Sequence, residues 1–519
     1  MKKTTFLKQI GKDNRKYKLK KAIAYLQTRL SFGERHKQKE RSYSIYQHNF
    51  YFNRSDNALP EQYYFKPTDI IIYDLIRKED LSATKKGLIR LLKKCYSHKF
   101  IGGSRSEEDI EDLITGLDQT IHSRNSWYKT SLFDFAYDDK LESYIKCFEI
   151  SFHNFSSSYA AIEMSIELSE KFINELSQFI KESYKKPGMC VHRMWGSNGK
   201  KSGARIRHAV STGVTNERAK NQLVYEQLQY VKKMFLQEMI KFFPLLQYAK
   251  YKDIESINVF ETNITPSLRL DKTIYSGLGL DEMFGFYFSL SERLYIFSKT
   301  MVARNAEKSD MMFLYNPNLI TDYKPYCSTH YKTLAQLTMD YMNELYRVVI
   351  LNNIGRNYQE LISEYRNRIN ECNNSRKQHR LLLRLQYQLN RDFYDFKKID
   401  EELPVDKELE RASKILENNK YAKSSICHGA HTYKHFADIP KWMWEQIRCN
   451  YTEVVNDLNR KLEISDALAK YSSERKNRNM GFIQVILAVM TFFLLIFPTK
   501  AQELAALIER IWNYLSSLF

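Results

Sequence analysis

Two stretches of alternating apolar and polar residues predict a β-hairpin in the first third of the chain. One runs over Tyr144–Phe152, where Phe148, Ile150 and Phe152 alternate with Cys147, Glu149 and Ser151. The other runs over Ile162–Leu168, where every second residue is apolar. A short polar segment, Asn154–Ser158, separates them. Alternation with a period of two turns one side of a strand to the core and the other to water. We therefore expect an antiparallel hairpin with one wet face.

Other segments with strand or helix periodicity surround this hairpin. Ile45–Phe52 and Asp69–Tyr73 have the composition of strands, and Gly285–Ser298 repeats the alternation of the hairpin. A helical pattern covers Asn216–Phe243 and stops at a proline, which ends helices. The mixture predicts an α+β domain over residues 42–331.

From Thr333 onward the apolar residues follow a helical repeat. Between Leu334 and Ile369 they recur about every 3.5 residues, the spacing of coiled coils, and Leu382–Phe396 continues it. A third helix is expected to begin at Asp438, a residue type that caps helix N-termini, with Pro440 in its first turn and no further proline before Pro498. Residues 332–478 are therefore predicted to form a helical stalk.

An uncharged run near the C-terminus predicts a transmembrane helix over residues 479–498. Met480–Phe497 carries no charged side chain, and at 1.5 Å per residue it is about as long as a bilayer core is thick. The basic residues Arg475, Lys476 and Arg478 precede it, and such charges stay inside. The N-terminal bulk is then cytoplasmic and the protein lies in the inner (cell) membrane. A buried core helix is the alternative.

Two features of the C-terminal end refine this prediction. Gln484, Ala488 and Thr491 fall on one side of the predicted span, which suggests a membrane or pore face where copies meet. In the alternative, Gln484 simply reaches the lipid headgroups. Residues 499–519 combine an apolar stripe with charges and predict an amphipathic interfacial tail. Packing against a neighbouring membrane helix is its competitor.

Composition and charge add a basic N-terminus to this plan. The 519 residues are 43% hydrophobic, which excludes wholesale disorder, and carry 80 Lys and Arg against 61 Asp and Glu. Residues 1–41 hold fourteen of the basic and three of the acidic residues and predict a basic amphipathic leader. Such a leader can pack on the main domain, bind anionic lipid or bind nucleic acid. The seven cysteines are scattered, so free thiols are expected.

Two clusters are candidate binding sites. The first holds a thiol and three imidazoles close together, which could coordinate zinc, although glycine and hydroxyl residues around them favour a plain loop. Its residues are Cys427, His428, His431 and His435. The second is a glycine-rich basic loop suited to anions or nucleic-acid backbones, with a solvated loop as the alternative. Its residues are Lys200, Lys201, Arg205 and Arg207.

The sequence predicts no enzyme. It contains no GxSxG, no HExxH and no set of kinase motifs, and the glycine-rich loop lacks the spacing of a Walker loop. No catalytic residue, no small-molecule substrate and no cofactor are therefore expected. Zinc at the histidine cluster is the exception, and an enzyme would depend on it.

The C-terminal layout resembles two kinds of membrane protein. A helical stalk that leads through the basic segment Ser473–Met480 into a membrane helix is similar to the CorA-like divalent-cation channels. Their Gly-Met-Asn signature is missing, and Phe497–Thr499 stands in its place, so cation selectivity does not carry over. The resemblance implies an oligomeric membrane assembly. The same layout resembles the membrane-anchored effectors of bacterial anti-phage systems.

These features lead to one expected function and two alternatives. We expect a membrane-embedded, homo-oligomeric effector that forms a pore or perturbs the bilayer, with a cytoplasmic domain that senses nucleic acid or a phage-derived trigger. A CorA-like cation channel is one alternative. A membrane-tethered nucleic-acid-binding protein, in which the span only anchors, is the other.

Overall fold

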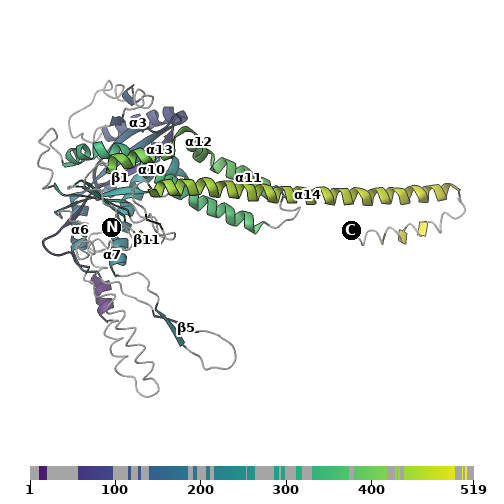
Figure 1. Cartoon of the computed structure of the whole chain (residues 1–519), viewed down its shortest axis with the longest axis horizontal. Coiled ribbons are helices and arrows are strands. Elements are labelled where there is room, and N and C mark those ends of the chain that lie inside the picture. Colours follow the sequence, from purple (N-terminus) through teal and green to yellow (C-terminus); the bar gives the residue numbers. More distant parts are fainter. Residues whose placement is uncertain are drawn as a thin grey trace, which may run out of the picture. The chain divides into compact units, whose positions relative to one another are not determined.

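A computed structural model gives the fold of the chain (Figure 1). It describes residues 11–19, 57–96, 115–117, 127–129, 139–184, 191–195, 206–210, 216–252, 254–263, 286–291, 294–298, 311–317, 330–372, 379–417, 427–428, 431–432 and 438–496, with a few residues between 505 and 513. The chain divides into two compact units. The α/β unit comprises Met1–Asn357 and Phe396–Glu445, and the helical unit comprises Tyr358–Asp395 and Gln446–Phe519.

The α/β unit is built on a mixed sheet, which in the described residues has eight strands in the order β2-β3-β4-β1-β7-β10-β9-β8. Neighbouring strands are antiparallel, except that β10 runs parallel to β7. The strands are β1 (Phe65–Arg77), β2 (Trp127–Lys129), β3 (Ile145–Asn154), β4 (Tyr159–Leu168), β7 (Ser256–Thr262), β8 (Phe286–Ser291), β9 (Leu294–Ser298) and β10 (Met311–Tyr315). The predicted strand Asp69–Tyr73 is the middle of β1, and Gly285–Ser298 contains the β8–β9 hairpin.

One face of the sheet forms the main hydrophobic core with four helices. These are α3 (Leu81–Tyr96), α6 (Glu170–Lys181), α7 (Asn216–Met239) and α8 (Leu246–Tyr251). Alternate residues of β1 such as Ile70 and Ile72 pair with Ile166 and Met164 of β4 and are fully buried in this core. Helix α7 confirms the predicted helix, although it ends four residues earlier than expected.

Sequence and packing explain why α6 lies against this face. Its buried residues recur at helical spacing and form one apolar stripe: Phe172, Ile173, Leu176, Phe179 and Ile180. The Ser169 side chain caps the helix by accepting a hydrogen bond from the Phe172 backbone N–H at 3.3 Å. Helix α3 packs closely on the turn that follows α7. A Cβ on Gly87 would lie 1.7 Å from the Phe242 carbonyl oxygen, so only glycine fits there.

The β3–β4 hairpin is confirmed, but its predicted wet face is wrong. The strands pair in antiparallel register from Ile145↔Leu168 to Asn154↔Ala160. The polar side chains of this face, such as Glu149, Ser151 and Ser165, are buried rather than wet. Helix α10 (His330–Glu371) lies against this face, where its Tyr346 ring stacks on His153.

Further elements complete the α/β unit. They are η2 (Lys78–Asp80), α5 (Asp139–Glu142), α12 (Tyr394–Glu402), α13 (Val405–Glu417) and the two-stranded pairs β5 (Val191–Trp195) with β6 (Ile206–Val210) and β11 (Cys427–His428) with β12 (His431–Thr432). Residues 11–19 of the predicted basic leader are helical, and Asn14 of this helix donates to the Ser183 carbonyl at 3.1 Å.

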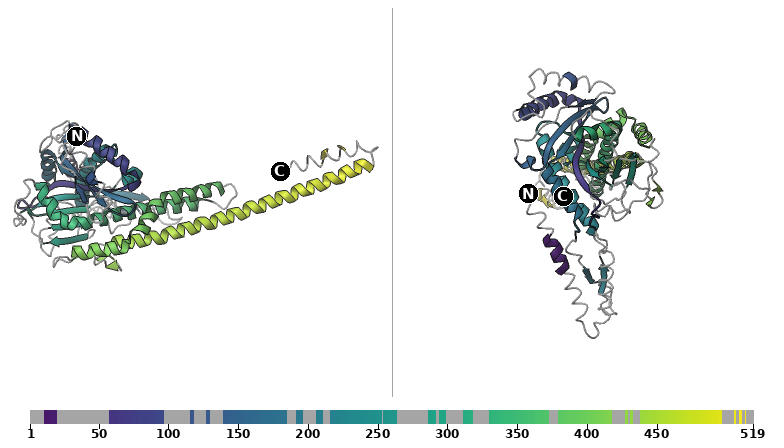
Figure 2. Two further views of the ribbon diagram at one scale, coloured as in Figure 1. Left: turned by 90° about the horizontal axis from the view of Figure 1, so that it is seen from above. Right: turned by 90° about the vertical axis from the view of Figure 1, so that its left-hand side faces the viewer.

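The helical unit confirms the predicted run of helices. It contains the second part of α10, all of α11 (His379–Asp392) and most of α14 (Asp438–Ile496), which begins at the expected capping residue and runs for 59 residues. The Phe393 ring packs between Tyr358 and Tyr451, at centroid distances of 5.0 and 4.7 Å. Lys461 of α14 donates to the carbonyls of Ile369 and Cys372 at 2.6 and 2.8 Å, which satisfies the end of α10. Figure 2 shows α14 continuing without a break.

The predicted transmembrane helix is wrong. Among the described residues, no helix combines the length and the apolarity that crossing a bilayer requires. Helix α14 ends at Ile496, so its uncharged part from Met480 has seventeen residues. At 1.5 Å per residue this is about 25 Å, less than the roughly 30 Å of a hydrocarbon core. The remainder of α14 is rich in charged residues.

Several predictions lie outside the described residues. They are the strand Ile45–Phe52, the leader beyond residue 19, the loop lysines Lys200 and Lys201 with Arg205, His435, and most of the tail 499–519.

Candidate functional site

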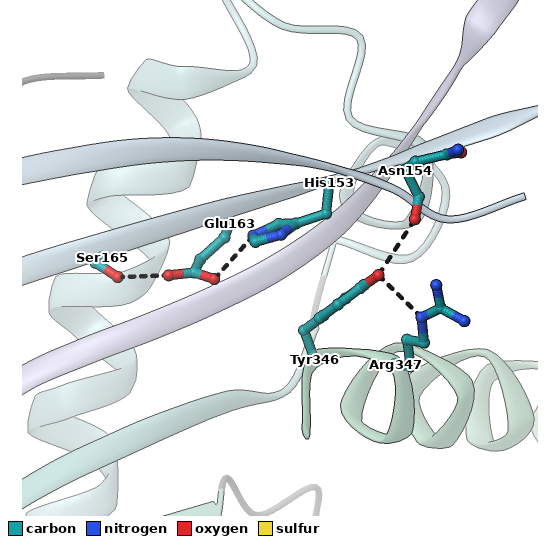
Figure 3. Close-up of polar contacts among 6 residues, drawn as sticks. All are labelled: His153, Asn154, Glu163, Ser165, Tyr346 and Arg347. Atoms are coloured by element: carbon teal, nitrogen blue, oxygen red, sulfur yellow. Dashed lines mark hydrogen bonds and ion pairs between the residues drawn. The ribbon is translucent and has the colours of Figure 1, made fainter. Parts of the chain in front are cut away.

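A polar cluster joins the β3–β4 hairpin to α10 (Figure 3). Glu163 of β4 accepts a hydrogen bond from the Ser165 hydroxyl at 3.3 Å, and its second oxygen lies 3.2 Å from His153 Nε2. The His153 ring stacks on Tyr346, with the ring centroids 4.7 Å apart. Tyr346 donates to the Asn154 carbonyl at 3.2 Å. The hairpin and the helix are thus connected through side chains that are almost entirely buried.

Arg347 extends this cluster to α13. Its Nε donates to the Tyr346 hydroxyl at 2.9 Å, and its guanidinium forms an ion pair with Glu408. Burial opposes the charge on Arg347, but Tyr346 and Glu408 outweigh this and raise the pKa of the guanidinium. The arginine is therefore a fixed cation inside the unit.

The turn of the hairpin is held by a carboxylate of α12. Glu402 accepts hydrogen bonds from the Ser156 hydroxyl at 2.8 Å, from the Ser158 backbone N–H at 2.9 Å and from the Ser158 hydroxyl. Burial works against ionisation, but these serine donors prevail and lower the pKa of Glu402. Helices α10 and α12 are thus fastened to one end of the β3–β4 hairpin, and α13 is fastened to α10.

The order of groups in the cluster does not match a nucleophilic catalyst. In a serine hydrolase the imidazole lies between the hydroxyl and the carboxylate, so that it can take the hydroxyl proton. Here the Glu163 carboxylate lies between Ser165 and His153. The hydroxyl therefore lacks the imidazole base that activates the serine in that arrangement. Burial, reinforced by Glu163, also raises the pKa of the neighbouring Tyr73 well above its usual value and keeps this phenol protonated.

A second group of polar residues on the same sheet face contains a cysteine. The Cys147 thiol donates to Glu167 at 3.0 Å, and Lys146 donates to the other oxygen of Glu167 at 2.6 Å. Burial and Glu167 raise the pKa of Cys147 far above the usual range, so the thiolate that would act as a nucleophile does not form at neutral pH. Burial also raises the pKa of Asp69, which pairs with Glu167 across the sheet, to about 7.

The described residues contain no group of three or more His, Cys, Asp or Glu side chains arranged to hold a metal ion. The histidine cluster of the sequence is placed only in part. Cys427 and His428 lie in β11, opposite Thr432 and His431 of β12, so this backbone is a β-bridge rather than a helix. Zinc binding there stays a prediction, as does anion binding by the basic loop, of which Arg207 lies in β6 opposite Met194.

The second candidate is the end of α14, Met480–Ile496, which we call the apolar tip. Its large apolar side chains are exposed, led by Leu495 at 77%, Phe482 at 66% and Phe492 at 62%. At 100° per residue these three lie within about 140° of one another around the helix, and exposed Met480 and Leu487 extend the apolar surface beyond them. Gln484, Ala488 and Thr491 are exposed as well, and Thr491 donates to the Leu487 carbonyl of its own helix at 2.8 Å. Their role as a shared face stays a prediction.

Three exposed basic residues, Arg475, Lys476 and Arg478, lie directly before the apolar tip, and we call them the basic collar. Around the helix Arg475 and Arg478 are about 60° apart and Lys476 lies about 100° from Arg475, so the three side chains cover about 160° of the circumference. None has an ion-pair partner among the residues that the structure describes. From Arg475 to Ile496 the chain contains no acidic residue.

The sequence indicated the apolar tip but gave no indication of the polar cluster. The tip is visible as an uncharged run, whereas Glu163 and His153 appear in the sequence as ordinary solvent-facing strand residues. Comparison adds no relative to either candidate, because the chain matches no family model, no curated protein and no solved structure.

Proposed function

We propose that this protein is a lipid-associating effector whose apolar tip docks on membranes and perturbs them, while the α/β unit serves as its sensing or binding domain. The observation that carries the proposal is the exposure of the tip. Its large apolar side chains are half to three-quarters exposed over roughly two-thirds of the helix circumference, and Ile483, Ile486 and Met490 on the remaining side are less exposed. An apolar surface of this extent has few physical explanations in water.

The distribution of the exposed side chains favours lipid over a single partner helix. A partner helix covers one stripe of its neighbour, as the a and d positions of a coiled coil do. Side chains such as Leu487 and Leu495 lie off any stripe that contains Phe482, so one partner would leave them in water. Acyl chains surround a helix on all sides. Burying the exposed tip residues is worth on the order of 10 kcal/mol before the costs of association.

The polar cluster supports a binding function rather than catalysis. Its serine lacks an imidazole base, the cysteine of the second polar group is a protonated thiol, and the Arg347 charge is paired with Glu408. The cluster holds α10 and α12 on the sheet and α13 on α10, and α10 is the helix that continues into the helical unit. A pore lined by α14 is not part of the proposal, because no described helix is fit to cross a bilayer.

Flotation of the full-length protein with phosphatidylcholine–phosphatidylglycerol vesicles tests this function. The wild-type chain should float with the vesicles and release an enclosed dye, and the variant F482S/F492S/L495S should do neither. The control L381S/L383S/Y387S removes three exposed apolar residues from α11, each at least 44% exposed, and should float like wild type. A wild-type chain that stays with the protein-only fraction, or a tip variant that floats equally well, contradicts the proposal.

A further inference from the structure

The basic collar lies where lipid headgroups would be if the apolar tip entered the acyl region. Arg478 is four residues from Phe482, which is about 6 Å along a helix. Side chains on a helix lean toward its N-terminus, so the guanidinium and ammonium groups of the collar point away from the tip. Their charges therefore stay at the polar boundary while the tip is buried.

The chemistry of the collar suits anionic oxygens. Two of its three residues are arginines, whose planar guanidinium binds phosphate or carboxylate through two parallel hydrogen bonds. No acidic side chain lies within the collar or the tip, and the described residues offer the collar no ion pair. The three positive charges are thus available to an external anion.

The arrangement around the helix separates this site from an ordinary amphipathic surface helix. A helix that lies flat on a membrane carries its charges on one side and its apolar residues on the other. In α14 the three charges occupy about 160° of the circumference within one turn, and the exposed apolar residues begin in the next turn and continue to Ile496. Charge and apolarity are separated along the axis, which fits docking by the end of the helix.

From these observations we propose that the basic collar is a binding site for the headgroups of anionic lipids and makes docking of the apolar tip selective for anionic membranes. This inference rests on the proposed function and names the class of lipid that it requires. Each basic residue near an anionic bilayer contributes roughly 1 kcal/mol, so removing three should weaken binding by roughly 100-fold at low salt. The contribution should shrink as salt screens it.

Equilibrium binding to two kinds of vesicle tests the site. The full-length chain is titrated with vesicles of phosphatidylcholine alone and of phosphatidylcholine with phosphatidylglycerol. Wild type should prefer the anionic vesicles, and R475Q/K476Q/R478Q should lose that preference while keeping its weak binding to phosphatidylcholine. The control K86Q/K171Q/K233Q removes the same charge from exposed positions of α3, α6 and α7 and should behave like wild type.

The outcomes separate this inference from the proposed function. Equal binding of wild type to both vesicles, or a collar variant that keeps its anionic preference, overturns the selectivity and leaves lipid docking in place. Binding to neither vesicle overturns both. A parallel titration with a single-stranded oligonucleotide tests nucleic acid as the alternative anionic ligand. Collar-dependent binding to DNA without binding to vesicles assigns the charges to nucleic acid and overturns the inference.

Discussion

The polar cluster and the apolar tip invert the usual distribution of side chains in opposite ways. In the cluster, charged and hydroxyl groups such as Glu163 and Arg347 are inside the α/β unit and satisfy one another. In the tip, phenylalanine and leucine side chains face solvent. Buried polar groups that are hydrogen-bonded or ion-paired inside their own unit need no partner from outside it. Apolar side chains exposed over about two-thirds of a helix circumference gain free energy only from a partner outside that helix, which is why we place function at the tip and architecture at the cluster.

The largest expected effect separates a buried aromatic residue from an exposed one in the same unit. Phe393→Ala should lower the free energy of unfolding by about 3–5 kcal/mol, because the ring is fully buried between Tyr358 and Tyr451. Phe482→Ala should leave it unchanged and weaken vesicle binding instead. Urea denaturation and vesicle titration of both variants measure this. Loss of stability in Phe482→Ala would show that the tip is packed inside the protein.

The next effect depends on pH and concerns Asp69. Burial raises the pKa of its carboxyl to about 7, whereas an aspartate in the unfolded chain titrates near about 3.9. At a pH between these two values Asp69 is protonated in the folded chain and ionised in the unfolded chain. The free energy of unfolding therefore falls as the pH rises through this range and stays lower above about 7. Asp69→Asn should therefore stabilise the protein by up to about 4 kcal/mol near pH 8 and little near pH 4.

Asp74 of the same strand provides the contrast for that experiment. Its pKa is also raised to about 7, but its carboxylate accepts hydrogen bonds from the backbone N–H groups of Leu75, Gln247 and Tyr248 at 2.6, 2.8 and 2.9 Å. Asp74→Asn replaces an acceptor with a donor and should destabilise the chain. Urea midpoints at both pH values test the pair. Stabilisation by Asp74→Asn, or none by Asp69→Asn near pH 8, would contradict this account of the buried face.

A smaller effect is expected from the ion pair of the polar cluster. Glu408→Gln leaves the Arg347 charge buried beside Tyr346 and should cost about 3 kcal/mol of stability. Glu410→Gln removes a neighbouring carboxylate on the same helix that is paired with Lys414 at the surface, and its denaturation midpoint should not change. If Glu408→Gln abolishes lipid docking without loss of stability, the cluster has a functional role that we have not assigned.

The smallest effect is expected from Thr491. Its hydroxyl is satisfied by the Leu487 carbonyl of its own helix, so it does not require a polar partner. Thr491→Val should leave vesicle binding within about twofold of wild type, since interhelical polar contacts in lipid are worth only about 1 kcal/mol. A loss of binding or of dye release beyond tenfold would restore the shared polar face with Gln484 that the sequence suggested.

The sequence predicts the elements well where periodicity alone decides them. Alternation located β3 and β4, and the capping residue Asp438 located the start of α14. Local patterns do not show what covers a face. The hairpin was expected to be wet because its polar residues alternate, but Tyr346, which covers it, is 192 residues from its partner Asn154. Partners that distant leave no trace in a single sequence.

The same limit explains the two candidate sites. The apolar tip depends on a contiguous run and was visible, although the helix ends at Ile496 and is too short for the predicted span. The polar cluster depends on Glu402, which binds the turn of a hairpin far away in the sequence, and on Arg347 and Glu408, which are linked to that hairpin through Tyr346. Charged residues on amphipathic helices are usually solvated, so nothing marked these three as buried.

Hydrogen–deuterium exchange of the unmodified full-length chain, with and without anionic vesicles, tests the central claim most directly. Lipid that surrounds the tip should slow exchange of the backbone amides in Met480–Ile496, while peptides from β1, β3 and α11 exchange at unchanged rates. This pattern would place the lipid contact at the end of α14. Unchanged exchange in Met480–Ile496 under conditions where the chain floats with vesicles, or protection confined to another segment, would contradict the assignment of the apolar tip as the docking site.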